Sequence, residues 1–307
     1  MKYKSVDDIL PREQSDVKEL LHSFSNLIDE IVNFGTHMMK WETEKKLVGD
    51  ENIIPLLFLR NILETADAIS ILIKNSSVDA SKSSLRILLE NVLSLEYLLE
   101  KDTKNRALSF IVWIAHKDLK FYQKLDGNTQ VGKQFKAEFK KDSLIKNPAL
   151  TDSIDYLHAK NNSEELLNLP IYSEVEKEYK RTESKIKNPN WYSLFAGPQN
   201  IQQLAKYLNR NAIYEIMYRG YSGNVHATDI YKGKLYPNDK NTVDIVQIRN
   251  PKDAQSISID TVNYLLMSYL AYFKRIPEKK LDFQNWYLIF KKDFDELRNK
   301  KYTIEYK

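Results

Sequence analysis

The sequence contains no cysteine. Disulfide bonds, thiolate metal ligands and cysteine nucleophiles are therefore excluded for this chain. The absence is compatible with a reducing compartment, and we expect a cytoplasmic protein. Glycine and proline are also scarce, at 8 and 9 of 307 residues. Few turn-forming residues beside many leucine, isoleucine, lysine and glutamate residues predict long helices with few connections.

Long apolar runs are missing as well. The longest uncharged apolar run near the middle, ALSFIVWIA at 107–115, is about half as long as a membrane span requires. The N-terminal stretch MKYKSVDDILPREQ is charged and lacks the apolar core of a signal peptide. We therefore expect no membrane partner.

Neither sign of charge dominates the composition. Lysine and arginine exceed aspartate and glutamate by 46 − 42 = 4. This excess permits contact with an anion such as RNA, but it is below the level that would indicate nucleic-acid binding by itself. Two lysine-rich stretches, 133–146 and 177–187, are interleaved with acidic residues and are typical of solvated helix faces.

Helical periodicity is the main positive signal. Apolar residues recur at helical spacing in four long segments, at 15–46, 51–75, 79–100 and 103–125. The links between these segments are short, which favours antiparallel neighbours and predicts a helical bundle. Further helices are predicted at 130–141, 173–187, 198–208, 211–221, 259–275 and 283–298.

Two features interrupt the helical pattern. Residues 128–190 are more polar, so we expect a polar helical insertion or lid there. The alternating stretch TVDIVQIR follows the turn-forming PNDKN, which predicts a β-hairpin near 233–250. The expected fold class is therefore mainly α. Residues 1–127 would form an N-terminal bundle half, and residues 191–307 would pack on it as one domain.

An arginine and a glutamate lie four residues apart in two of the long helices. The stretch LRNILE contains Arg60 and Glu64, and LRILLE contains Arg86 and Glu90. Both pairs lie in apolar stretches, where a charge needs a partner, so each predicts an internal ion pair that fixes helix packing. In the functional alternative, Arg86 and Glu90 brace a polar site in the bundle.

The stretch YEIMYRGYSGNVHATD, at 214–229, contains the residues best suited to chemistry. Arg219 and His226 are separated by six residues. A histidine titrates near neutral pH and acts as a general base or acid. An arginine stays charged and binds phosphate oxygens with two donors. RNA cleavage without a metal needs both a proton acceptor and a cation at the phosphate.

This spacing resembles the Arg-x(4–6)-His signature of the HEPN superfamily, helical-bundle proteins that include many metal-independent ribonucleases. The resemblance implies that His226 is the general base or acid and that Arg219 binds the scissile phosphate. It further implies an RNA partner, no metal, and a site formed where two subunits of a homodimer meet. A toxin or effector in bacterial defence against phage is then expected, with the partner protein or antitoxin unknown.

The order of three motifs also resembles a bacterial helical family of uncharacterised function over roughly 57–229. Members show Arg-x-x-x-Glu on an early helix, a tryptophan before a middle helix, and Tyr-x-x-x-Tyr-Arg followed by Ser-x-x-x-His. The matching positions are Arg86, Glu90, Trp191, Tyr214, Tyr218, Arg219, Ser222 and His226. This likeness implies a fold and a focal region rather than a reaction.

The sequence departs from the HEPN pattern at Gly220, where a polar residue often follows the arginine; Asn224 is a candidate substitute. Ser222 is best explained as the N-cap of a short helix. In the structural alternative, a carboxylate pairs with Arg219, and Glu90 or a tyrosine satisfies His226. The chain would then be a non-catalytic module that binds a protein, a nucleic acid or a small ligand.

Motifs for cofactors are missing from the sequence. It has no phosphate-binding glycine loop and no dinucleotide fingerprint. It also lacks the Glu-x-x-His repeats that hold two metals in a helical bundle. We therefore expect no cofactor and no metal.

Overall fold

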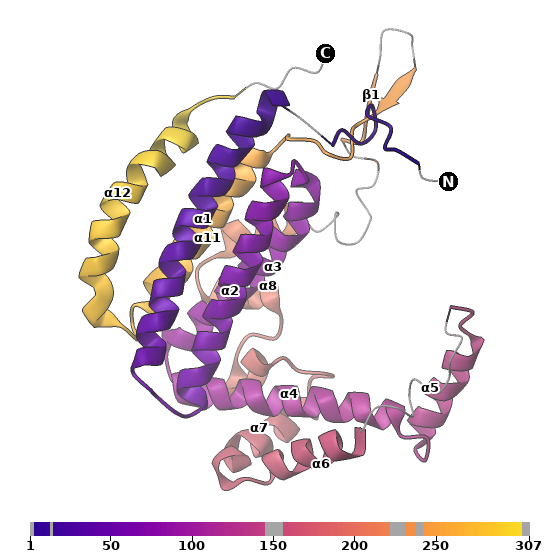
Figure 1. The fold of residues 1–307 in the computed structure, drawn as a ribbon. Helices are drawn as coiled ribbons and strands as arrows, with labels where there is room; N and C mark the ends of the chain where they lie inside the picture. Colours follow the sequence, from indigo (N-terminus) through magenta and orange to yellow (C-terminus); the bar gives the residue numbers. More distant parts are fainter. Residues whose placement is uncertain are drawn as a thin grey trace. The chain divides into compact units, whose positions relative to one another are not determined.

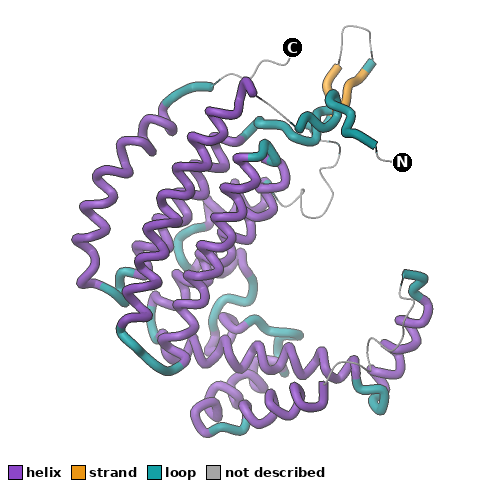
Figure 2. Tube along the Cα trace, viewed as in Figure 1, coloured by secondary structure: helices purple, strands orange, loops and turns teal. Residues whose placement is uncertain are grey.

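The computed structural model confirms a mainly α fold (Figures 1 and 2). It describes residues 3–12, 15–144, 156–221, 231, 233–237 and 242–302. The chain divides into two compact units. The bundle unit comprises Met1–Lys101 and Leu204–Lys307, and the central unit comprises Asp102–Gln203. The three-part division made from the sequence stays a prediction. Within the described residues, no helix is both long and apolar enough to cross a membrane.

Four helices form the core of the bundle unit: α1 (Ser15–Glu44), α2 (Asp50–Lys74), α3 (Val78–Glu100) and α11 (Ala254–Tyr272). They contact one another in a ring, α1 with α2, α2 with α3, α3 with α11, and α11 with α1. Short links join the first three, which run in alternating directions (Figure 1). The predicted bundle is therefore confirmed for this unit.

The α11 helix is central, as its almost entirely apolar sequence indicates. Tyr269 is completely buried, and its hydroxyl donates a hydrogen bond of 2.7 Å to the backbone oxygen of Ile31. Burial raises the pKa of this phenol, which therefore remains protonated. Gly35 on α1 faces the same side chain. A Cβ at Gly35 would collide with Tyr269 and Leu63, so the close approach of α1 requires glycine.

The last helix, α12 (Lys280–Asn299), follows the short 3₁₀ helix η5 (Pro277–Lys279) and packs on α1 and α11. Its contact with α1 is aromatic. The rings of Phe34 and Trp286 stack with centroids 4.3 Å apart, and the Trp286 indole donates to Glu30 at 2.9 Å. Burial of these aromatic side chains holds α12, whose sequence is otherwise polar, against the bundle.

The predicted hairpin is confirmed, although its strands are short. Strand β1 (Leu235–Pro237) pairs antiparallel with β2 (Val243–Ile245), with Leu235 opposite Ile245. All six strand residues are exposed. A two-stranded ribbon is marginal alone. Here Lys234, just before β1, forms an ion pair with Asp79 of α3.

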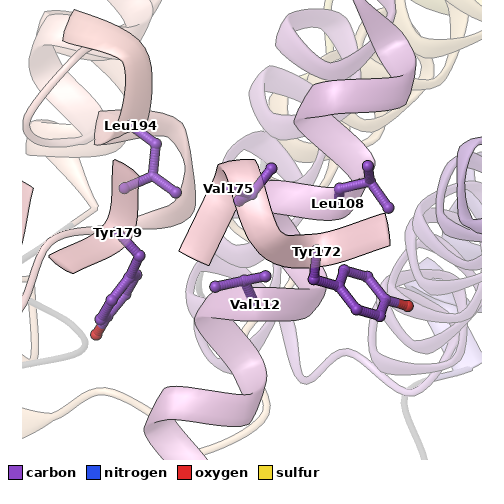
Figure 3. Close-up of a cluster of buried hydrophobic side chains, with 6 residues drawn as sticks. All are labelled: Leu108, Val112, Tyr172, Val175, Tyr179 and Leu194. Atoms are coloured by element: carbon purple, nitrogen blue, oxygen red, sulfur yellow. The ribbon is translucent and has the colours of Figure 1, made fainter. Parts of the chain in front are cut away.

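The central unit contains α4 (Thr103–Leu125), α5 (Gln130–Lys141), α6 (Tyr156–Leu167) and α7 (Ser173–Glu183). Two 3₁₀ helices, η2 (Pro170–Tyr172) and η3 (Trp191–Ala196), complete it. Its core joins α4, η2, α7 and η3 (Figure 3). The buried side chains are Leu108, Val112, Tyr172, Val175, Tyr179 and Leu194.

Helix α6 was not predicted from the sequence. The polar stretch around it shows weak periodicity, and its apolar contribution comes mainly from Leu166 and Leu167 at the C-terminal end. These two leucines pack against the buried cluster of the central unit. A tertiary contact with α4 therefore supports a helix that local sequence alone does not indicate.

Glu178 of α7 organises the backbone of this unit. Its side chain is 9% exposed and pairs with Arg181 at 2.7 Å. It also accepts a hydrogen bond of 3.0 Å from Thr182 and one of 2.7 Å from the backbone N–H of Phe195. Phe195 has a φ of 54°, a left-handed conformation that costs free energy for a non-glycine residue. The carboxylate therefore holds the strained η3 turn against α7.

Replacing Glu178 by alanine is expected to destabilise the central unit by about 2 to 3 kcal/mol, because buried donors lose their acceptor. Arg181 holds the pKa of Glu178 below its ordinary value of 4.5, so this contribution is present above that pH and declines as the carboxylate is protonated. Hydrogen exchange at the Phe195 amide measures the effect. The matched variant Glu174→Ala changes an exposed residue of α7 and should leave that amide protected.

Candidate functional site

One continuous segment lies along α3 in the bundle unit, from the end of α8 (Ile201–Tyr207) through α9 (Asn211–Ile213) to η4 (Tyr214–Tyr218). Three polar contacts fix its direction. Tyr207 donates to Glu100 at 3.1 Å, Arg210 forms a two-pronged ion pair with Glu96 at 2.9 and 3.2 Å, and Arg86 donates to Tyr218 at 2.5 Å. Because later residues meet earlier positions of α3, the segment runs antiparallel to that helix.

The η4 turn is a π-helix. Its backbone N–H at Arg219 bonds to the carbonyl of Tyr214, five residues earlier. Tyr214 and Tyr218 are both buried, and their rings stack with centroids 4.8 Å apart. Single π turns inside helices are rare and are frequent at functional sites. The turn therefore marks the same place that the sequence motifs indicate.

Arg86, Glu90 and Tyr218 are brought together by the fold. The Arg86 guanidinium carbon lies 4.1 Å from the centroid of the Tyr218 ring, and its Nε is 3.6 Å from Glu90 Oε1. Burial raises the pKa of Tyr218, and the Glu90 carboxylate acts in the same direction, although Arg86 opposes it. The tyrosine is therefore a neutral hydrogen-bond partner at physiological pH. The supporting role predicted for these residues stays a prediction.

The second Arg–Glu pair behaves differently. Arg60 and Glu64 form an ion pair of 2.7 Å on α2, with 58% and 60% of their side chains exposed. Its prediction as an internal pair was wrong, because the pair lies on the outward face of an otherwise apolar helix. Of these two arginines, Arg86 is the one that the fold largely covers, with 14% of its side chain exposed.

Arg219 follows the π turn directly and faces solvent. Its side chain is 61% exposed and forms an ion pair of 3.1 Å with Glu215. A surface pair of this kind contributes roughly 0 to 1 kcal/mol, so an anionic ligand displaces the carboxylate at little cost. Ser222, Asn224 and His226 lie outside the described residues. The pairing of Arg219 with His226 therefore stays a prediction.

A pocket that the sequence did not indicate lies between this segment and α11. It has a volume of about 530 Å³ and a mostly apolar wall. The residues that line it are Ala212, Ile213, Ile216, Met217, Asp260, Asn263, Tyr264, Leu266 and Met267. Asp260 is the only ionisable carboxylate among them. Burial raises its pKa to about 7.

Two phenols share the surroundings of Asp260. Burial, followed by the Asp260 charge, raises the pKa of both Tyr221 and Tyr264. The Tyr264 hydroxyl is buried and makes no hydrogen bond within the described part of the chain. A carboxyl group that titrates near neutral pH is suited to proton transfer or to binding a cationic ligand. The available sequence signal was the lone acid in the apolar stretch SISIDTVNYLL.

The described ranges contain no group of three or more histidine, aspartate or glutamate side chains arranged to hold a metal ion. His116 of the central unit has a structural environment instead. It contacts Glu176 at 2.7 Å and stacks on Tyr179 with ring centroids 3.9 Å apart, which is a packing role.

Comparison with protein families gives a match over more than half of the chain. A family model described as a family of unknown function, DUF5677, matches residues 52–233. The matched range contains Arg86, Glu90, Tyr218 and Arg219, and it agrees with the extent of the predicted resemblance to an uncharacterised helical family. No curated protein and no solved structure matches the chain.

Proposed function

The chain belongs to the family of unknown function DUF5677, and from its residues we propose that it is a HEPN-like, metal-independent endoribonuclease with Arg219 and His226 as the catalytic pair. The observation that carries the proposal is the position of Arg219. Its guanidinium is exposed, yet it follows a π turn anchored to α3 through Tyr218 and Arg86. A cation that is both accessible and fixed in place is what binding of a scissile phosphate requires.

The two residues have complementary roles in the proposed reaction. His226 takes the proton from the 2′-hydroxyl of the nucleotide before the scissile bond, or returns a proton to the leaving 5′ oxygen. The 2′ oxygen then attacks the phosphorus, and the bond to the 5′ oxygen breaks. Arg219 donates to the non-bridging oxygens, where negative charge increases during the attack. In a homodimer, a second copy of the Arg219 and His226 pair would face the same phosphate, and its histidine would carry out the other of these two proton transfers.

The experiment compares RNA cleavage by the wild-type chain in EDTA with cleavage by single variants. Arg219→Ala and His226→Ala are each expected to reduce the rate by at least about 100-fold, the usual contribution of a general acid–base or charge-stabilising group. Expression of the active chain should slow bacterial growth, as expected of a toxin in phage defence, and both variants should relieve the effect.

Two variants provide matched controls. Arg60→Ala removes an arginine with nearly the same exposure and the same type of surface ion pair, and His37→Ala removes an exposed histidine of α1. Both should cleave RNA at the wild-type rate. Equal activity in Arg219→Ala and wild type would refute the proposed site. If the wild-type chain cleaves RNA without EDTA but not in its presence, the metal-independent mechanism is refuted.

A second function has one observation in its favour. The pocket at Asp260 combines a half-buried carboxyl with a wall of isoleucine, methionine and leucine side chains. Such a pocket fits a small ligand with an amine and an apolar body. If the chain cuts no RNA, this candidate predicts thermal stabilisation by an amphiphilic amine, with the effect reduced in Asp260→Asn.

A further inference from the structure

A second pocket lies in the bundle unit, where α1 begins and α2 ends. It has a volume of about 380 Å³. Four segments meet there: the N-terminal segment, the start of α1, the end of α2, and the segment that precedes α11. The residues that line it are Pro11, Arg12, Ser15, Lys18, Leu21, His22, Lys74, Asn75, Ser76 and Arg249.

The lining of this pocket has one sign of charge. It includes Arg12, Lys18, Lys74 and Arg249, and no aspartate or glutamate among the described residues. Such a concentration makes the pocket attractive to anions.

Two lysines of the lysine-rich stretches are different, because they have acidic partners. Lys141 pairs with Glu138 at 2.7 Å, and Lys180 pairs with Glu176 at 2.8 Å. No ion pair joins Arg12, Lys18 or Lys74 to a carboxylate in the described part of the chain. The positive pocket is therefore a feature of the fold and not of lysine-rich sequence.

The pocket is held together by the backbone. Ile248 donates its N–H to the backbone oxygen of Ile9 at 2.8 Å, and the Arg249 guanidinium donates to the backbone oxygen of Arg12 at 3.4 Å. Ser77 and Asn250 form an isolated parallel bridge. These contacts bring cations from distant parts of the sequence together despite their mutual repulsion. A preorganised cluster of this kind loses little conformational entropy when an anion binds.

Ser76 provides an independent observation. It is 3% exposed, and its hydroxyl makes no hydrogen bond with any described residue. Its φ of 60° is in the left-handed region, which is unfavourable for serine. A buried hydroxyl without a partner, on a strained backbone in the wall of a positive pocket, is a donor available to a ligand. The start of α1 adds partial positive charge beside it.

We propose that this pocket binds a small phosphorylated molecule through a phosphate group with at least two negative charges. Guanidinium groups bind phosphate oxygens with paired donors, lysines add charge, and the Ser76 hydroxyl donates one further hydrogen bond. Pro11, which is partly exposed, gives an apolar surface for the body of the ligand. The volume is within the range of small-molecule sites. The site uses neither Arg219 nor His226, so it stands whether or not the chain is a ribonuclease.

The experiment is calorimetric titration of the full chain with inorganic pyrophosphate at fixed, low ionic strength. The double variant Lys74→Gln with Arg249→Gln should weaken binding at least tenfold. Ser76→Gly removes the hydroxyl and suits the positive φ, so it should weaken binding severalfold without lowering the melting temperature. Lys141→Gln with Lys180→Gln removes the same total charge outside the pocket and should leave the affinity within twofold.

Three results would overturn the proposal. One is the absence of pyrophosphate binding to the wild-type chain, including the case where a short single-stranded RNA or phosphatidic-acid vesicles bind instead. Another is equal weakening by the two double variants, which would show an effect of net charge alone. The third is unchanged affinity in the Lys74 and Arg249 double variant, provided its melting temperature matches that of wild type.

Discussion

Replacing Glu42 by alanine is expected to lower the free energy of unfolding of the bundle unit by about 3 to 5 kcal/mol. The Glu42 side chain is 3% exposed, and Arg275 contacts its Oε1 at 2.9 Å and 2.5 Å. Arg275 is itself 13% exposed and also donates to the backbone oxygen of Glu51 and to Asn52. The contact therefore ties the end of α11 to the end of α1 and the start of α2.

The size of this effect comes from the charge left behind. Alanine at position 42 removes the carboxylate but leaves the Arg275 guanidinium in a largely dry place, where an uncompensated charge is costly. The double variant Glu42→Met with Arg275→Met removes both charges and should recover part of the loss. Glu44→Ala, in an exposed pair with Lys40, should change the free energy by less than about 1 kcal/mol.

Urea denaturation combined with hydrogen exchange in α1 and α11 measures these differences. Exchange is informative because the chain has two compact units, and amides in these helices report on the bundle unit alone. A loss of less than 1 kcal/mol in Glu42→Ala would contradict the assignment of this pair as a structural anchor.

Replacing Asp260 by asparagine is expected to stabilise the bundle unit at pH 8 by about 2 to 4 kcal/mol. The pKa of Asp260 is raised by burial from 3.8 to about 7. Between these values the folded protein retains a proton that the unfolded chain has released. The free energy of unfolding therefore falls as the pH rises from about 4 to about 7 and changes little above that, at about 1.4 kcal/mol per unit of pKa difference.

The asparagine variant lacks this titration. The two proteins should differ least near pH 4, where the unfolded chain, with a pKa of 3.8 for this group, has only partly released its proton, and the difference should grow up to about pH 7. Thermal melts across pH 4 to 8 measure the slope. The control Asp293→Asn changes an exposed aspartate of α12 and should keep the wild-type slope. If the stability of wild type and of Asp260→Asn changes with pH at the same slope, the raised pKa of this carboxyl is contradicted.

The carboxyl groups of Glu42 and Asp260 show that sequence patterns do not identify which polar side chains the fold covers. Glu42 follows the apolar stripe of α1, and Asp260 lies within the apolar sequence of α11, but neither position has a local motif. Arg86 and Glu90 could be paired from their spacing of four residues. The Tyr218 hydroxyl that accepts from Arg86 lies 132 residues later, and no local pattern places it there.

The sequence by itself determined the fold class and the long helices of the first half of the chain. The bounds of α2, α3 and α4 lie within about one residue of the predicted segments, because apolar spacing and end signals are local properties of the chain. It also determined where the hairpin forms, since turn residues and strand alternation are local too.

Only the tertiary structure decided which polar groups are buried and which charges meet. It largely covered Arg86 and exposed Arg60, two arginines in nearly identical hexapeptides. It gathered Arg12, Lys18, Lys74 and Arg249 around one pocket. The physical reason is that desolvation and Coulomb interaction depend on distances through space, which segments far apart in the sequence acquire only when the helices pack.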